Sequence, residues 1–188
     1  TPITCVATVT RAAGVATPTG TVSWVTDGTG TIATSPCTLV PGAGGSSTCS
    51  VTYTPTVVGD GTHQLTATYS GSAAFSGSVG SQTVTVNLRP VTVTADPQTK
   101  VYYDDDPTLT YQVTAGSLRT GDTFTGALTR VPGEDVGTYA IQQGTLALNA
   151  NYLLTYVGAN LTITPFTLTV TAHPQTKEYG KDDPNLTY

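Results

Sequence analysis

The chain has 188 residues, only 10% of them charged, and a net charge of −5. Its seven Lys and Arg residues are too few for a basic stripe, which argues against nucleic acid as a partner. No apolar run reaches the roughly 20 residues that span a bilayer, so the sequence predicts no membrane span in this segment. Threonine fills 41 positions, and 20 glycines and 12 prolines supply turns. This composition predicts an all-β fold.

Residues 1–88 are expected to form a small β-sandwich. Apolar and polar residues alternate clearly in 64–69, and turn signals such as Gly59-Asp60-Gly61 separate the segments. Short strands at this spacing are typical of a sandwich. Six strands are predicted, at about 2–10, 20–26, 31–40, 47–54, 63–69 and 82–88.

The three cysteines favour one disulfide. Cys37 and Cys49 flank a Gly/Ser-rich loop, and on the two arms of a hairpin they would face each other. Their bridge would stabilise the fold by roughly 3 kcal/mol in the chain-entropy model. Cys5 shares a strand face with Ala7 and Val9, which predicts a buried free thiol; a Cys5–Cys49 bridge is the alternative. The cysteine spacing does not favour a metal site.

The order of motifs in 1–88 resembles a known repeat. PTGTVSW (18–24), CTLVPG (37–42) and the long run from Thr48 to Val86 are similar to the bacterial Ig-like repeat of the third type. Trp24 stands where that family usually has Phe, and Ser72 stands where it often has Asp. The resemblance implies an Ig-like sandwich. Because the family's usual first strand is missing, it also implies an open edge.

A long repeat appears in the second half of the chain. Residues 91–111, VTVTADPQTKVYYDDDPTLTY, return 77 positions later as 168–188, LTVTAHPQTKEYGKDDPNLTY, with 15 of 21 residues identical. A fixed period of this size indicates a tandem array of small domains. The second copy stops at Tyr188 and the chain begins without Met. We interpret the chain as a window on a longer repetitive protein, or as a subunit whose ends another chain completes.

Residues 89–165 closely resemble the MBG repeat of large bacterial surface proteins, in its tyrosine-glycine type. The hallmark Y-G-x-x-D-P is intact at 179–184, but Tyr103 replaces its glycine at 102–107. If that glycine needs a positive φ, Tyr103 is strained or the turn differs. The sequence leaves open whether this domain is a sandwich or a β-grasp-like sheet, and one helical turn is predicted within 116–122.

The expected organisation is therefore a string of small β domains. Residues 1–88 form the Ig-like domain, residues 89–165 the MBG domain, and residues 166–188 the start of a further MBG repeat. These last 23 residues are expected to form strands, but one hairpin buries too little surface to fold alone.

The best metal candidate is the acidic cluster Asp104, Asp105 and Asp106. Calcium prefers six to eight oxygen ligands, which carboxylates on a tight loop can supply. The alternative is that Asp before Pro caps a turn, and Lys181 in the second copy opposes a cation. No other cofactor is expected. Six tyrosines offer either a sugar-stacking surface or core residues with hydroxyls at the rim: Tyr102, Tyr103, Tyr111, Tyr139, Tyr152 and Tyr156.

No catalytic residue is predicted. His63 and His173 lie in no nucleophile or metal motif, and His63 is expected to be structural. Residues 1–88 contain no Lys, which excludes a Lys–Asn isopeptide crosslink in that domain. In the second domain, Lys100 could supply the amine for such a crosslink.

The expected function is a structural repeat segment of an extracellular bacterial surface protein, either an adhesin stalk or a surface filament. The alternative is an adhesive module that binds surface glycans. A third hypothesis concerns assembly: residues 166–188 would pair with other copies or neighbouring repeats, by strand addition or by exchange with 89–111.

Overall fold

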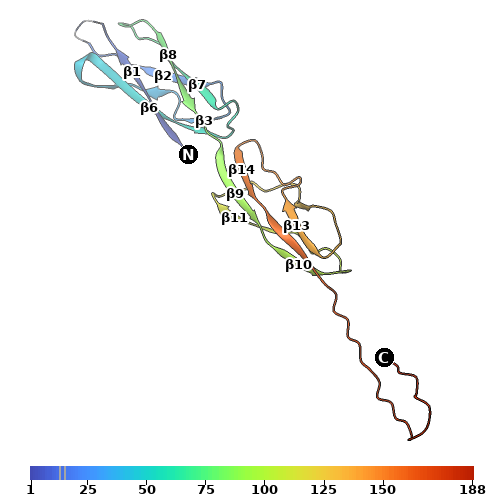
Figure 1. The fold of residues 1–188 in the computed structure, drawn as a ribbon. Coiled ribbons are helices and arrows are strands. Elements are labelled where there is room, and N and C mark those ends of the chain that lie inside the picture. Colours follow the sequence, from blue (N-terminus) through green and yellow to red (C-terminus); the bar gives the residue numbers. More distant parts are fainter. Residues whose placement is uncertain (13, 15) are drawn as a thin grey trace. The chain divides into compact units, whose positions relative to one another are not determined.

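The computed structural model describes residues 1–12, 14 and 16–188. Strands dominate this described part, so the all-β prediction is confirmed (Figure 1). Its single helical element is the 3₁₀ turn η1 (Ala43–Gly45). No helix within the described part is long and apolar enough to cross a membrane. Two compact units make up the chain: residues 1–93, 113–125 and 147–155 form one, and residues 94–112, 126–146 and 156–188 form the other.

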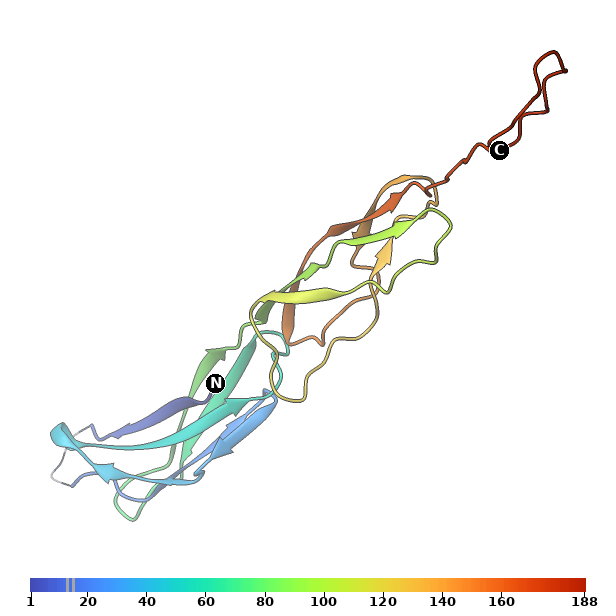
Figure 2. The same ribbon diagram turned by 90° about the horizontal axis from the view of Figure 1, so that it is seen from below.

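The Ig-like part of the first unit has two antiparallel sheets (Figure 2). One has the order β1-β6-β3, with a short strand β5 also paired to β6. Its bounds are β1 Ile3–Thr10, β3 Gly30–Ala33, β5 Val40–Pro41 and β6 Ser46–Pro55. The other sheet has the order β4-β2-β7-β8. Its bounds are β2 Thr21–Thr26, β4 Cys37–Thr38, β7 Thr62–Tyr69 and β8 Ser78–Thr85.

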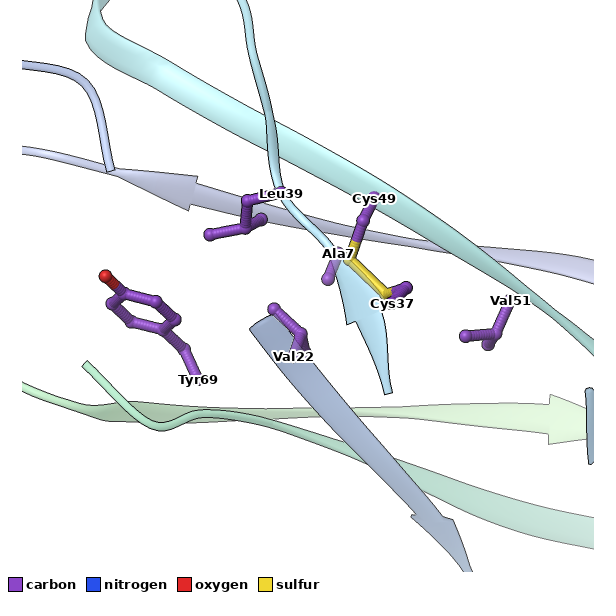
Figure 3. Close-up of a cluster of buried hydrophobic side chains, with 7 residues drawn as sticks. All are labelled: Ala7, Val22, Cys37, Leu39, Cys49, Val51 and Tyr69. Atoms are coloured by element: carbon purple, nitrogen blue, oxygen red, sulfur yellow. A yellow bond between two sulfur atoms is a disulfide. The ribbon is translucent and has the colours of Figure 1, made fainter. Parts of the chain in front are cut away.

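The core of this sandwich is an apolar cluster drawn from both sheets (Figure 3). Period-two alternation along each strand sends one set of side chains inward. The buried members are Ala7, Val22, Cys37, Leu39, Cys49, Val51 and Tyr69.

The disulfide between Cys37 and Cys49 lies in this core and joins the two sheets. Cys37 is on β4, which pairs with β2, whereas Cys49 is on β6. The expectation that they sit on two arms of one hairpin is wrong, because the chain changes sheets at Leu39: β4 belongs to one sheet and β5 to the other. The Cα atoms are 5.8 Å apart. Cys5 is free and half-buried, and burial raises the pKa of its thiol.

Two predicted strand boundaries are wrong. The strand expected over 31–40 divides into β3, β4 and β5, because Thr34 has a φ of +64° and Pro36 lacks a main-chain donor. The strand expected over 82–88 begins earlier, at Ser78. Its Ser/Gly-rich start suggested a loop, but main-chain pairing with β7 from Tyr69 to Thr62 needs no apolar side chains.

The second half of the chain also contributes two sheets and, among the described residues, no helix. The four-stranded sheet β10-β15-β13-β12 includes one parallel pair, β10 with β15. Its bounds are β10 Gln98–Val101, β12 Thr129–Arg130, β13 Gly137–Gln142 and β15 Ala159–Thr164. The three-stranded sheet β11-β9-β14 has the bounds β9 Arg89–Ala95, β11 Tyr111–Ala115 and β14 Tyr152–Val157. Ala95, Ile141 and Leu161 form the buried cluster of this part.

Residues 116–122 form no helical turn, contrary to prediction. Gly116 and Gly121 have φ values of +77° and +94°, which are incompatible with a right-handed helix. The amide of Arg119 donates to the Tyr152 hydroxyl at 2.9 Å instead of to a helical carbonyl.

Residues 166–188 also contain no strand, although strands were expected there. The ends of a loop are joined by a hydrogen bond from the amide of His173 to the carbonyl of Thr187, at 3.1 Å. An isolated two-stranded segment buries too little surface to hold a ladder.

Candidate functional site

The acidic cluster lies beside two cationic side chains. Lys100 Nζ is 2.8 Å from one oxygen of Asp106, and Arg130 Nε is 2.5 Å from the other. Asp104 and Asp105 are exposed. Within the described ranges, no three His, Cys, Asp or Glu side chains gather as a metal site would require. The Asp106 oxygens therefore have protein cations as partners, which disfavours the calcium hypothesis.

Four alternating charges close into an ion-pair ring of Lys100, Asp106, Arg130 and Glu134. Arg130 binds Asp106 through both Nε and Nη2, a bidentate geometry that adds direction as well as charge. Glu134 pairs with Arg130 through one oxygen and with Lys100 through the other, at 2.5 Å in the second case. The two cationic side chains are only 5% and 11% exposed. The formal charge of the ring is zero, so burial leaves no cation unpaired.

The contacts within the ion-pair ring shift the pKa values of its side chains. Hydrogen bonds from Arg130, and then from Lys100, lower the pKa of Asp106 to about 2. The pKa of Glu134 is lowered mainly by Lys100, and the pKa of Lys100 is raised mainly by Asp106. Because the carboxyl pKa values are depressed, the ring contributes stability at neutral pH that is lost only in strong acid.

The local chain positions Arg130 at the end of β12. Its Nη1 donates to the carbonyls of Val131 at 3.0 Å and Gly133 at 2.7 Å. Its guanidinium lies over the Tyr139 ring, 5.5 Å from the centroid. Gly133 has a φ of +149°, and a Cβ there would lie 2.2 Å from the Tyr139 ring, so this turn requires glycine.

Next to the ion-pair ring, the aromatic side chains of Tyr102 and Tyr103 form an edge-to-face pair with centroids 4.4 Å apart. Tyr103 has a φ of +75°, and Gly180, its counterpart in the second copy, has a φ of +78°. The turn is thus the same in both copies, and Tyr103 is in the left-handed region that favours glycine. A cavity of about 360 Å³ adjoins the pair and is lined also by Lys100, Glu134 and the three aspartates.

The six tyrosines do not form one surface. Tyr103 is 86% exposed, whereas Tyr152 is buried and donates to Asp122 at 2.6 Å. Tyr139 and Tyr156 donate to the carbonyls of Asp135 and Ile141, each at 2.8 Å. Three of the six hydroxyls thus have main-chain or carboxylate acceptors, and Tyr102 and Tyr103 are the two of the six tyrosines that line this cavity.

His63 is buried in the sandwich between two partners. Its Nδ1 is 2.5 Å from the Tyr53 hydroxyl, and its Nε2 is 3.2 Å from the Val58 carbonyl. An Nε2–H that donates to Val58 leaves Nδ1 to accept from Tyr53, so both ring nitrogens are satisfied. A Cβ on Gly28 would lie 2.2 Å from the imidazole, so the histidine fills a space that this glycine leaves.

Sequence reasoning did not identify the ion-pair ring. Lys100 and Asp106 recur in the second copy as Lys177 and Asp183, which also form an ion pair in the structure. Sequence reasoning did not connect the first pair with Arg130 and Glu134, which are about 30 residues away in the chain. The signal available was the recurrence of a Lys and an Asp six residues apart in both copies. Lys100 has carboxylate partners here, and no asparagine contacts its amine among the described hydrogen bonds.

These observations define a chain of two-sheet β domains whose notable side chains serve packing and ion pairing. Residues 1–87 match the family model of the bacterial Ig-like domain (group 3), and residues 91–162 match that of the MBG domain (YGX type). Both predicted families, and their order, are confirmed. No curated protein and no solved structure matches the chain.

The two families together indicate a repeat segment of a bacterial surface protein. Their domains are typically structural rather than catalytic, and they usually occur in surface or extracellular proteins.

Proposed function

We propose that this chain is a structural segment of an extracellular adhesin stalk or surface filament, which spaces and displays what lies beyond it. The succession of the two families carries the proposal. It includes a division into an Ig-like domain at 1–88, an MBG domain at 89–165, and a further repeat starting at 166. Contact between copies through 166–188 belongs to the same proposal.

Two internal crosslinks support a mechanical role. The Cys37–Cys49 disulfide joins the two sheets of the Ig-like sandwich. The ion-pair ring joins Lys100 on β10 to Arg130 on β12, which are the two edge strands of the same four-stranded sheet. Such links oppose the separation of strands and sheets when a chain is stretched.

Single-molecule pulling tests this role. Each domain should unfold in a separate step under force, and reduction should lengthen the step of the Ig-like domain by roughly 35 Å. The added length is the 12-residue separation that the disulfide hides, at about 3.3–3.6 Å per residue, less the 5.8 Å that already separates the two Cα atoms. A single cooperative event for the whole chain, or no resolved event, contradicts the proposal.

A second candidate function is glycan binding at Tyr102 and Tyr103. The exposed ring of Tyr103 and the adjoining cavity of about 360 Å³ offer a stacking face beside carboxylate acceptors. A glycan array would test it with the wild type, Tyr103→Ala and the control Tyr179→Ala. Signals that only Tyr103→Ala abolishes support the candidate, and an array without hits removes it.

A further inference from the structure

The cavity of about 360 Å³ beside Tyr102 and Tyr103 combines aromatic faces with acidic groups. Its volume lies at the lower end of the range of small-ligand sites, about 300–1,000 Å³. The two aromatic planes meet at an angle of 62°, so they form a corner instead of a stack. Tyr103 is 86% exposed, which leaves most of its ring accessible to the apolar C–H face of a pyranose.

Two acidic groups of this cavity are not neutralised within the protein. The four charges of the ion-pair ring, three of which line the cavity, cancel one another. Asp104 and Asp105 also line the cavity and are exposed. Among the described residues, their carboxylates have no hydrogen-bonded or ion-paired partner. The cavity therefore presents two uncompensated negative charges beside an exposed aromatic ring.

The second copy of the repeat differs at two positions that define this cavity. Gly180 stands in place of Tyr103, and Lys181 stands in place of Asp104. The first copy has Tyr103 at a φ of +75°, which favours glycine, so its ring is present at a cost in backbone conformation. The repeated scaffold does not require either side chain of the first copy, whereas contact with a ligand would use both.

The uncompensated charge selects among glycans. A uronic or sialic acid would bring a further carboxylate to Asp104 and Asp105, and the like charges would repel. A neutral sugar could stack on Tyr103 but would add only neutral donors to the carboxylates. A sugar with a free ammonium group can stack in the same way and also donate charge-assisted hydrogen bonds to the carboxylates. The net charge of −5 on the chain attracts such a cationic glycan over a longer range.

We propose that the cavity beside Tyr102 and Tyr103 binds the glucosamine units of an amine-bearing glycan. A pyranose ring lies on Tyr103, and its ammonium group lies at Asp104 and Asp105. This inference rests on the second candidate function, glycan binding, and names the class of glycan. Each exposed ion pair contributes little, so the aromatic face and both carboxylates are needed together.

The test compares two oligosaccharides of equal length that differ in charge. Glucosamine hexamer and N-acetylglucosamine hexamer are titrated into the full chain by calorimetry, in mildly acidic buffer where the sugar amines are protonated. The glucosamine hexamer should bind about tenfold more tightly, as expected for two exposed ion pairs. This difference should shrink as salt is added, because salt screens exposed charges.

Two variants separate the aromatic and the acidic part of the site. Tyr103→Ala should weaken the binding of both hexamers by about tenfold, because both stack on the ring. Asp104→Asn combined with Asp105→Asn should weaken only the glucosamine hexamer and make the two sugars bind alike. The controls make the same kinds of change at exposed side chains of the second copy and should bind as the wild type does: Tyr179→Ala, and Glu178→Gln with Asp182→Asn. Circular dichroism melts verify that each variant is folded.

Three results would overturn the inference. If the wild type binds both hexamers equally and Tyr103→Ala weakens both, glycan binding stands but the selection for amines does not. If the controls lose as much affinity as the site variants, the binding is a general attraction of a polycation to an acidic chain. If neither hexamer binds, the inference fails, and the glycan array decides separately whether another glycan occupies the site.

Discussion

The two copies of the repeat have nearly the same sequence and different structures. Residues 91–111 form β9, β10 and the start of β11, whereas 168–188 contain no strand. Val93 is fully buried, but its counterpart Val170 is 77% exposed. The difference shows that this sequence forms a strand only where a partner strand is present. Strands β9 and β10 pair with β14 and β15, and the second copy has no equivalent partner strands among the described residues.

The ion pairs repeat this lesson. Lys177 pairs with Asp183 as Lys100 pairs with Asp106, yet 44% of the Lys177 side chain is exposed against 5% for Lys100. The first pair is completed by Arg130 and Glu134 on segments that the second copy does not have within 188 residues. The local sequence provides half of the ring, and the fold brings the other half to it.

The largest expected effect comes from placing the same charge in each copy. Val93→Asp buries an unpaired carboxylate and should lower the free energy of unfolding of its domain by more than about 4 kcal/mol. Val170→Asp should change it by less than about 0.5 kcal/mol, because that side chain is exposed. Urea denaturation at a protein concentration where the chain is monomeric measures both. Equal losses would refute the contrast between the copies.

Removal of the Arg130 guanidinium, which has no counterpart in the second copy, should give the next largest effect on stability. Arg130→Met keeps the volume but leaves Lys100 as the one ring cation for both Asp106 and Glu134, and should cost about 1–3 kcal/mol of stability. Lys177→Met, in the second copy, is the control and should have no measurable effect. Chemical denaturation distinguishes them, and a wild-type midpoint for Arg130→Met would count against the ring.

Relief of the strained turn at Tyr103 should increase the stability of the domain. Tyr103→Gly should stabilise the domain by about 1 kcal/mol, since Tyr103 occupies the left-handed region that Gly180 occupies without cost. Tyr103→Ala removes the ring but retains a Cβ at the same φ, so it should not show this gain. A thermal melt that ranks Ala above Gly would contradict the strain.

The smallest effect is a pH dependence. The pKa of Asp106 is lowered to about 2, so its contribution is complete above the ordinary Asp value near 3.8 and is lost as the pH falls through about 2. The stability difference between wild type and Asp106→Asn should therefore be about 1 kcal/mol at pH 6, reduced by solvent screening because the side chain is 41% exposed, and vanish near pH 2. Stability curves from pH 2 to 6 measure it. A difference that grows in acid would reverse the assigned sign.

Sequence reasoning was reliable where the relevant chemistry is local. Alternating apolar residues located β7. The Y-G hallmark left two alternatives for Tyr103, a strained residue or a different turn, and its φ of +75° beside +78° at Gly180 supports the first. Sequence reasoning was wrong at 116–122, because the left-handed glycines and the Tyr152 hydroxyl that determine that loop act against a weak helical signal.

By itself, the sequence determined the all-β class, the two families and the repeat, because β-branched composition, turn residues and motif order are properties of short segments. Only the tertiary structure decided that Cys37 and Cys49 join two sheets, that Asp106 faces Lys100 and Arg130 instead of lying in a cluster of ligands, and that Glu134 lines one cavity with Tyr102 and Tyr103. Each of these depends on segments that are distant in the chain, and their pairing depends on which partner strands are present. Residues 168–188 show the limit most directly, since a strand-forming sequence contains no strand where the described residues offer it no partner strand.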